Sequence, residues 1–415
     1  MKKRIVSMLT TVVFIFSIAG TAVFAEETKK VEEVKPVAVE MTMQDAIKYA
    51  GEHNKTIRDL KKVYDDYYDT YKSMKDTTYT SQNSSKGGIT FDLDSDMNIS
   101  ALVTALGSLG STPSAYSRTA NDDYAIYKGY ALENTQNLYN DLLKTKESAE
   151  QGIYYNIEKL VYDIDKTEKE LVYLKNTKKK LEKDLLISQI MLKLKMITKL
   201  QFDKSKNALN QMDSTIKLTN NILAAKINAL KGLLGIDRNV TLKIKPEKFE
   251  YKAIGEVNIE EVIKEALAKR ADALKSVHKL RGKETDFLVY DYEKNSIAAD
   301  TYYEAQKNYE NAKADYENEI SDIKFNVQKV YDALILSQST YTDTLENFNS
   351  VAETHRINKI KYSNGMISTV ELMGSELAYQ KAQIDLEKAL SDNVLAKKRF
   401  ALACTITDPD ATAGQ

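Results

Sequence analysis

The sequence predicts an all-α protein whose long antiparallel coiled-coil helices form two tandem structural repeats. Three observations support this fold class. Only four prolines and 15 glycines occur among 415 residues, so long stretches contain no helix breaker. Apolar residues recur at spacings of three and four, which is typical of packed helices. Two pairs of segments also resemble each other, in the same order along the chain.

A stripe of apolar residues marks the longest predicted helix of the first half. Lys and Glu fill the positions between, as the solvated faces of a helix require. The same spacing returns over residues 322–399. A helix of about 70 residues would be roughly 105 Å long, which suits a bundle or rod better than a compact domain with one core. The stripe runs through Ile157, Val161, Ile164, Glu168, Leu171, Leu174, Lys178, Leu181, Leu185, Ser188 and Leu192, of which eight are apolar.

The two halves share short segments in the same order. Residues 42–50 resemble residues 258–266, each with a polar N-cap, an acidic first turn and an apolar stripe. Residues 196–202 resemble residues 366–372. We interpret the chain as two copies of one helical unit, the alternative being a chance match of two short apolar patterns.

The first repeat contains an additional segment. The offsets of the two matches are 259 − 43 = 216 and 366 − 196 = 170, so the first half is 46 residues longer between them. The source is residues 77–121, rich in Ser, Thr and Gly, which we expect to form an irregular or β insertion. Within it, residues 87–94 alternate like a half-buried strand, and residues 89–99 come nearest to the pattern of a membrane strand. The repeats are therefore expected at 41–240 and 241–404, followed by a short tail at 405–415.

The N-terminal residues 1–25 are typical of a secretory signal peptide. A basic start is followed by an apolar stretch and small residues that end at Ala25, where we expect cleavage. The alternative is an uncleaved anchor, because about 20 apolar residues could span a bilayer. Residues 26–40 are charged and are expected to be a disordered lead-in. The chain is therefore expected to be exported to the cell envelope.

Composition excludes several classes of function. The net charge of −1 argues against a nucleic-acid partner, which would need a basic excess. The single cysteine excludes an intrachain disulfide framework and any cysteine zinc site, and three separated histidines do not make a metal site. No nucleophile elbow or phosphate loop occurs. We therefore expect neither an enzyme nor a cofactor.

The closest local match to a known family lies in the second half, and the resemblance rests on the order and duplication of several such segments. Residues 362–372 resemble the Tyr-x-x-Gly-x-x-Ser-x-x-Glu/Asp-Leu signature of the TolC family of outer-membrane efflux proteins. Residues 43–54 resemble the opening helix of that family. Residues 230–237 resemble its first-half helix end, with Gly235 placed to follow a helix C-terminus. The resemblance covers nearly all of the chain after the leader.

The resemblance implies a homotrimeric, hollow helical cylinder that acts as a passive duct in efflux or type I secretion. It also implies two partners, a periplasmic adaptor and an inner-membrane transporter. The chain departs from the family in one respect, because we expect the second half to lack the β-hairpin that helps to form the membrane barrel. Residues 283–319 are charged, rich in tyrosine and free of turn residues, and are expected to continue as helix.

The resemblance places candidate adaptor contacts at the tips of the helical hairpins. Gly365 would allow close backbone approach, or would simply relieve crowding at a helix end. Tyr362 and Ser368 are candidates for hydrogen bonds between helices, with packing as the alternative. The candidate residues are Tyr362, Gly365, Met366, Ser368 and Glu371 in the second half and Lys195, Met196 and Thr198 in the first.

Two other functions remain as alternatives to the duct. The chain could be an elongated envelope scaffold or surface protein that has lost the pore. It could also be a periplasmic adaptor, although it lacks the β-rich domains that adaptors need.

A tyrosine cluster at helical spacing is expected to pack in the core or between protomers, with cargo binding as the alternative. Its members are Tyr64, Tyr67, Tyr68 and Tyr71.

Overall fold

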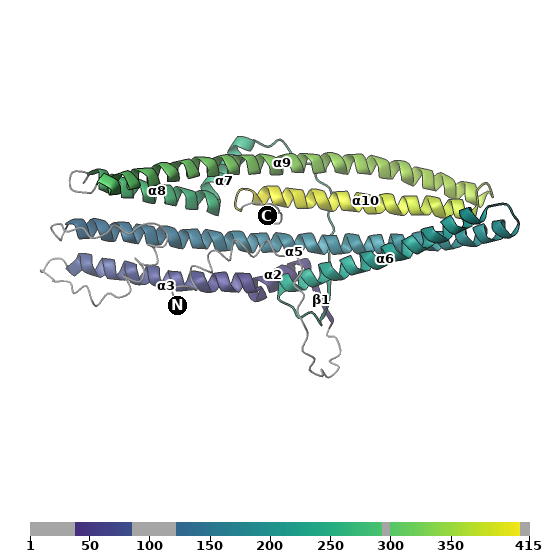
Figure 1. Cartoon of the computed structure of the whole chain (residues 1–415), viewed down its shortest axis with the longest axis horizontal. Helices are drawn as coiled ribbons and strands as arrows, with labels where there is room; N and C mark the ends of the chain where they lie inside the picture. The colour runs from purple at the N-terminus through teal and green to yellow at the C-terminus, as the bar shows by residue number, and fades with distance from the viewer. Residues whose placement is uncertain (1–37, 85–121, 293–298, 407–415) are drawn as a thin grey trace, which may run out of the picture. The chain divides into compact units, whose positions relative to one another are not determined.

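A computed structural model describes residues 38–84, 122–292 and 299–406, which form eight helices and two short strands (Figure 1). The prediction of an all-α fold is confirmed for this part of the chain. The elements are β1 (Ala38–Thr42), α2 (Met43–His53), α3 (Lys55–Ser84), α5 (Asp122–Lys193), α6 (Lys199–Leu234), β2 (Thr241–Lys245), α7 (Ile259–Lys269), α8 (Ala271–Tyr292), α9 (Ala299–Ser363) and α10 (Thr369–Leu402).

The described residues divide into two compact units. Unit 1 contains residues up to 58, residues 149–265 and residues from 325 onward. Unit 2 contains residues 59–148 and 266–324. The long helices α5 and α9 each contribute residues to both units. We describe each unit separately.

In unit 1 the helices lie in the order α6–α5–α10–α9 (Figure 1). Side-chain pairs define each seam between neighbours. Lys178 Nζ of α5 lies 2.7 Å from Asp213 of α6, and Lys169 Nζ of α5 lies 2.6 Å from Glu387 of α10. The helix α10 also contacts α9, where the ring of Tyr379 packs on Phe348. The helices α6 and α9 therefore form the two edges of this layer.

Neighbouring helices of unit 1 run antiparallel, as the coiled-coil pattern predicted. Along the seam between α5 and α10, partner numbers fall on one helix as they rise on the other. Glu158 pairs with Lys398 at 2.6 Å, and Asn176 donates to Gln380 at 3.0 Å. Near the start of α10, a Cβ added at Gly374 would lie 3.7 Å from Cε of Lys180. One antiparallel register thus persists along the whole seam.

The core of unit 1 includes the short helix α2. Met43, Ala46 and Ala50 are at most 2% exposed and pack with Ile157 of α5 and Leu234 of α6. Beside this core, β1 and β2 pair in parallel, from Ala38 opposite Thr241 to Thr42 opposite Lys245. Residues 26–40 were predicted to be disordered, and this prediction is wrong for residues 38–40, which belong to the strand β1. Residues 26–37 lie outside the described residues.

In unit 2 the order is α3–α5–α8–α9. The ring of Tyr139 of α5 contacts tyrosines of α3, and Asp141 of α5 lies 2.7 Å from Nδ1 of His278 of α8. The helices α8 and α9 meet through Lys279 and Asp315 at 2.6 Å. Each unit is therefore a layer of two adjacent helical hairpins.

The repeat predicted from the sequence is visible at matching breaks. The helices α2 and α7 each have 11 residues and end before Asn54 and Arg270, which are offset by 270 − 54 = 216. Both break residues are polar and buried, at 4% and 2% exposure. Asn54 donates to the carbonyl of Leu233 at 2.7 Å and accepts from the N–H of Ile57 at 3.1 Å. A buried polar residue thus turns the chain at the same point of each repeat.

Two expectations about the repeats need correction. The helix α3 continues to Ser84, so residues 77–84 are helical and the insertion is shorter than predicted. Residues 283–319 do not form one helix, because α8 ends at Tyr292 and α9 begins at Ala299 on an antiparallel path. Only residues 293–298 separate these helices, too few for two membrane strands of about 9–11 residues each. The predicted strand at 89–99 lies outside the described residues.

Gly235 ends α6 in the way the sequence predicted. Its φ is 71°, and the N–H of Ile236 donates to the carbonyl of Lys231 at 2.9 Å, which closes a left-handed cap. A Cβ at Gly235 would lie 2.7 Å from the carbonyl oxygen of His53. This position therefore needs glycine for two separate reasons.

We expect Gly235→Ala to lower the free energy of unfolding by about 1–3 kcal/mol, because the left-handed backbone and the clash with His53 both add strain. Thermal unfolding followed by circular dichroism measures this change. Gly232→Ala is the matched control, since no atom lies within 4 Å of its added Cβ and alanine favours the helix. Equal melting of the two variants would contradict this account of Gly235.

Candidate functional site

The candidate site consists of the two helical turns of unit 1. One turn, residues 194–198, joins α5 to α6, and the other, residues 364–368, joins α9 to α10. Both turns lie at the same end of the unit, on the right of Figure 1. All eight residues predicted as candidate contacts lie in these turns or within three residues of them. Their contact with an adaptor stays a prediction.

The two turns share one backbone conformation. Lys195 has φ 58° and Gly365 has φ 71°, at equivalent positions. The N–H of Met196 donates to the carbonyl of Met191, and the N–H of Met366 to that of Lys361, each at 2.8 Å. This is the 6→1 bond of a Schellman cap. The structure thus confirms the match between residues 196–202 and 366–372 at the level of individual hydrogen bonds.

The reason for glycine at 365 differs from the predicted crowding. No atom lies within 4 Å of a Cβ added there, so this chain leaves open space around Gly365. Its positive φ is what favours glycine. Lys195 adopts the same conformation with a side chain, at a cost of about 1–2 kcal/mol. The first turn is therefore the more strained of the two.

Each turn is followed by a capping box. Thr198 accepts from the N–H of Gln201 at 3.3 Å, and Ser368 accepts from the N–H of Glu371 at 3.2 Å. Bonds from the backbone N–H and hydroxyl of Ser368 lower the pKa of Glu371, since they stabilise its carboxylate. Sequence reasoning missed Gln201, although the pattern S/T-x-x-E/Q is readable from the sequence.

The two residues predicted to bond between helices have different roles. The hydroxyl of Tyr362 lies 3.3 Å from Oγ1 of Thr369, which links the end of α9 to the start of α10. Ser368 instead caps α10, its own helix. Within this chain, Tyr362 therefore provides the link between helices and Ser368 fixes where the second helix begins.

We expect the double variant Thr198→Ala and Ser368→Ala to lower the free energy of unfolding by about 1 kcal/mol per site, because each loses an N-cap acceptor. Amide hydrogen exchange should rise first in the opening turns of α6 and α10. Thr198→Ser with Ser368→Thr keeps both hydroxyls and serves as the control. Unchanged exchange at both turns in the alanine variant would contradict the role of these caps.

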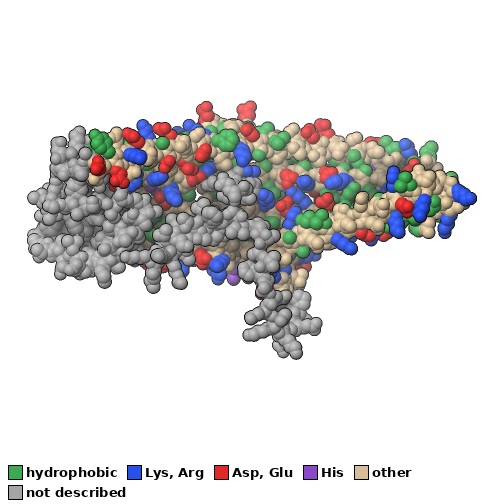
Figure 2. All heavy atoms as spheres, in the orientation of Figure 1, with side chains coloured by type: hydrophobic (Ala, Val, Ile, Leu, Met, Phe, Trp, Pro, Cys, Tyr) green, Lys and Arg blue, Asp and Glu red, His purple; other side chains and the backbone are tan. Residues whose placement is uncertain are grey.

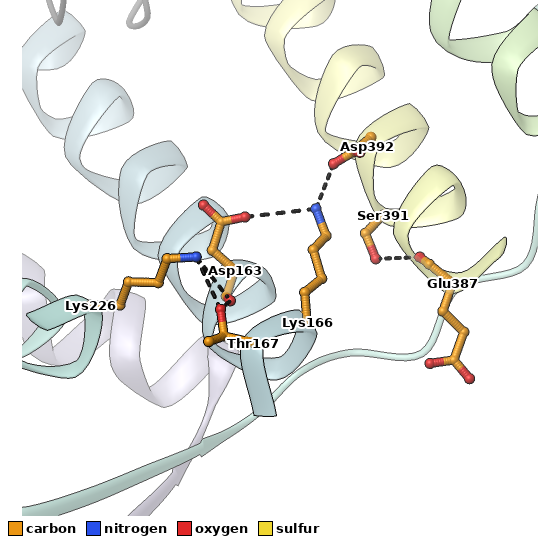
Figure 3. A network of polar contacts seen from close by, with 7 residues as sticks. All are labelled: Asp163, Lys166, Thr167, Lys226, Glu387, Ser391 and Asp392. Atoms are coloured by element: carbon orange, nitrogen blue, oxygen red, sulfur yellow. Dashed lines mark hydrogen bonds and ion pairs between the residues drawn. The ribbon is translucent and has the colours of Figure 1, made fainter. Parts of the chain in front are cut away.

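A polar network near the middle of α5, away from the turns, ties the two hairpins of unit 1 together (Figure 3). Lys166 Nζ of α5 lies 2.5 Å from Asp392 of α10 and 3.7 Å from Asp163 of its own helix. Lys226 of α6 donates to Oγ1 of Thr167 at 3.0 Å and to the carbonyl of Asp163 at 3.4 Å. The network joins α6, α5 and α10 and fixes their register.

The tyrosine cluster packs α3 against α5 in unit 2. The ring centroid of Tyr139 lies 5.1 Å from that of Tyr64, 5.6 Å from Tyr68 and 5.5 Å from Tyr71. The hydrogen bond between the Tyr64 and Tyr139 hydroxyls, with burial, raises the pKa of Tyr139 to about 12. Packing between helices is therefore confirmed within the chain for three of the four predicted members, Tyr64, Tyr68 and Tyr71.

The histidines serve in local contacts. His53 Nδ1 lies 3.0 Å from the carbonyl of Tyr49, and His355 Nδ1 lies 3.0 Å from the hydroxyl of Ser375. Among the residues described, no group of three or more His, Cys, Asp or Glu is placed to hold a metal ion. In the same part of the chain, no helix is both long and apolar enough to cross a bilayer.

Two tandem pairs of hairpins, with short helices at the start of each repeat and capped turns at one end of unit 1, define a fold class. The described residues have the fold of the TolC-type outer-membrane channels. No family model matches the sequence, and no curated protein matches it either. The likeness is therefore one of structure.

Three solved structures illustrate this likeness. A membrane protein from Pseudomonas aeruginosa aligns with a TM-score of 0.61 and 12% identity, over 96% of this chain and 99% of its own. The outer membrane protein VceC from Vibrio cholerae aligns at 0.55 and 11%, over 88% and 96%. The open state of the MtrE outer membrane channel from Neisseria gonorrhoeae aligns at 0.55 and 11%, over 94% and 96%. The shared fold thus extends over nearly the whole of each protein.

Proposed function

We propose that this protein is a TolC-like duct component of the cell envelope, a passive channel for efflux or type I secretion. The observation that carries the proposal is the likeness of fold to outer-membrane channels over almost the full length of both chains. A duct performs no chemistry and lowers the barrier for polar cargo by providing a wet path. The predicted leader peptide would deliver the chain to the envelope, and to the outer membrane where one is present.

The edges of unit 1 support assembly with further copies of the chain. The helices α6 and α9 lie at opposite edges of the layer and carry exposed apolar side chains. Leu218 is 60% exposed on α6, while Phe325 and Leu336 are 71% and 68% exposed on α9. Contact of α6 of one copy with α9 of the next is heterologous, and such contacts form rings when the rotation closes. A homotrimer built in this way would enclose the duct.

The capped turns support contact with partner proteins. They bring two hairpin ends with the same backbone conformation to one end of unit 1. We propose that a periplasmic adaptor binds there and links the duct to an inner-membrane transporter, which supplies the energy. Met196 and Met366, 65% and 73% exposed, are the foremost contact residues.

The partner contacts can be tested by photo-crosslinking in the native cell. A photoreactive residue at position 196 or 366 should capture an envelope protein with a long helical hairpin. The same residue at exposed position 303 of unit 2 is the control. Deletion of the gene should also increase sensitivity to exported compounds. Absence of capture at both turns, with normal export after deletion, would contradict the duct.

The second candidate function is an envelope scaffold that has lost the pore. The short separation of α8 and α9, residues 293–298, favours it, because it leaves no room for a second pair of membrane strands. A monomer bound to the cell wall, in cells with normal export after deletion, would support the scaffold. A trimer that co-purifies with an adaptor would exclude it.

A further inference from the structure

The two turns of unit 1 share a composition that the proposed duct does not require. Residues 185–202 contain three lysines and no Asp or Glu. Residues 357–370 contain two lysines and again no Asp or Glu. The chain as a whole has a net charge of −1, so these two segments are basic islands. The lysines are Lys193, Lys195, Lys199, Lys359 and Lys361, all exposed.

Large apolar side chains project among these lysines. Leu194 is 64% exposed, Met196 65%, Leu200 66% and Met366 73%. Scattered exposed apolar residues are ordinary, but several at one end of a unit mark an interaction surface. Figure 2 shows basic and apolar side chains close together at the right-hand end, where the turns lie, with some acidic side chains among them.

This combination also fits a membrane surface, in addition to the adaptor proposed above. A bilayer accepts projecting apolar side chains without a shaped pocket, and lysines extend their ammonium groups to the headgroups. A uniform anionic surface attracts lysines wherever they lie in its plane. A protein partner needs a fixed register, which charges of both signs help to set. Five lysines lie in these two segments, and the one carboxylate among the candidate residues, that of Glu371, forms a capping box with Ser368.

We propose that the two turns form a docking surface for anionic phospholipid membranes. Leu194, Met196, Leu200 and Met366 enter the headgroup region, while the neighbouring lysines bind lipid phosphates. The attraction requires no adaptor, so the surface would hold the hairpin ends at a membrane whether or not the duct has its partners. The proposal therefore stands or falls independently of the proposed function.

Vesicle co-sedimentation of the full chain tests this surface. The chain should bind vesicles of phosphatidylglycerol and phosphatidylcholine in equal parts, bind pure phosphatidylcholine far less, and release as salt rises. Changing Lys193, Lys195 and Lys199 to Gln should weaken binding to the anionic vesicles by about 100-fold. Leu194→Ser, Met196→Ser and Met366→Ser together should weaken binding to both kinds of vesicle.

Two control variants separate the turns from the rest of the chain. The first changes three exposed lysines outside the turns, Lys217, Lys243 and Lys248, to Gln, and the second is Leu288→Ser on α8. Both should bind vesicles as strongly as the unchanged protein does. The apolar N-terminal segment is the same in all variants, so it cannot cause a difference between them. Equal binding by turn and control variants, or no preference for anionic vesicles, would overturn the proposal. If the unchanged protein does not bind vesicles, and the turn variants lose crosslinking to the adaptor, the surface binds an acidic protein instead of a membrane.

Discussion

Replacing Arg270 by leucine should lower the free energy of unfolding of unit 2 by about 3–5 kcal/mol. Arg270 is 2% exposed and lies at the break between α7 and α8. Its Nε and Nη2 donate to the two carboxylate oxygens of Asp272 at 3.0 and 2.5 Å. Burial and the charge of Asp272 raise the pKa of Glu319, and Arg270 opposes that rise. Leucine would leave two carboxylates close together without this cation.

Chemical unfolding at two pH values measures this effect and identifies its cause. The pKa of Glu319 in the folded protein is already above its ordinary value, which it has in the unfolded chain. Its ionised form therefore lowers the free energy of unfolding at pH values above the folded-state pKa. This loss of stability disappears as the pH falls to the ordinary pKa, because the carboxyl is then protonated. Loss of Arg270 raises the folded-state pKa further. The deficit of the variant should therefore be larger at neutral pH than near the ordinary pKa of a glutamate.

Arg281→Leu is the matched control, because Arg281 lies on the exposed side of the same helix α8. It should change the free energy of unfolding by no more than about 0.5 kcal/mol. A deficit of Arg270→Leu that is the same at both pH values would show that lost packing, not unpaired carboxylates, is responsible.

The double variant Phe325→Glu and Leu336→Glu should convert the assembled protein to monomers. These side chains are the most exposed apolar groups on the α9 edge, at 71% and 68%. Placing two unpaired carboxylates in an apolar interface costs several kcal/mol, which weakens association by about 100-fold or more. Analytical ultracentrifugation measures the mass, and export should fall in parallel because a monomer encloses no passage.

Positive charges introduced on the opposite edge, that of α6, provide the control. If α6 of one copy meets α9 of the next, Leu218→Lys and Ile222→Lys should restore assembly when combined with the two glutamates. The lysine variant alone should be monomeric. A glutamate variant that keeps the mass of the unchanged protein would contradict the pairing of α6 with α9.

Much of the fold follows from local sequence features. The scarcity of proline and the apolar spacing predict the long helices. Gly235 and Gly365 mark helix ends because only a residue tolerant of positive φ ends a helix in this way. The offset of 216 places the breaks at Asn54 and Arg270 in register. The helices and their ends depend on neighbouring residues, and the offset comes from comparing the two halves, so the sequence displays all of these features directly.

The order of helices could not be predicted in the same way. Lys166 and Asp392 define the seam between α5 and α10, but they are 226 residues apart, and many other lysines and aspartates fit the same pattern. The break between α8 and α9 carries no Gly or Pro in residues 293–298. At Lys195 the chain adopts a left-handed conformation without glycine, so the first turn lacked the signal that identified the second.

The central claim is that copies of this chain associate through α6 and α9 to enclose a passage. Electron microscopy of the purified full chain, with native mass spectrometry of the same sample, tests it most directly. The account predicts three copies around an open axis, with α6 of each copy beside α9 of the next. A particle with the mass of one chain, or an assembly with no open axis, would contradict it.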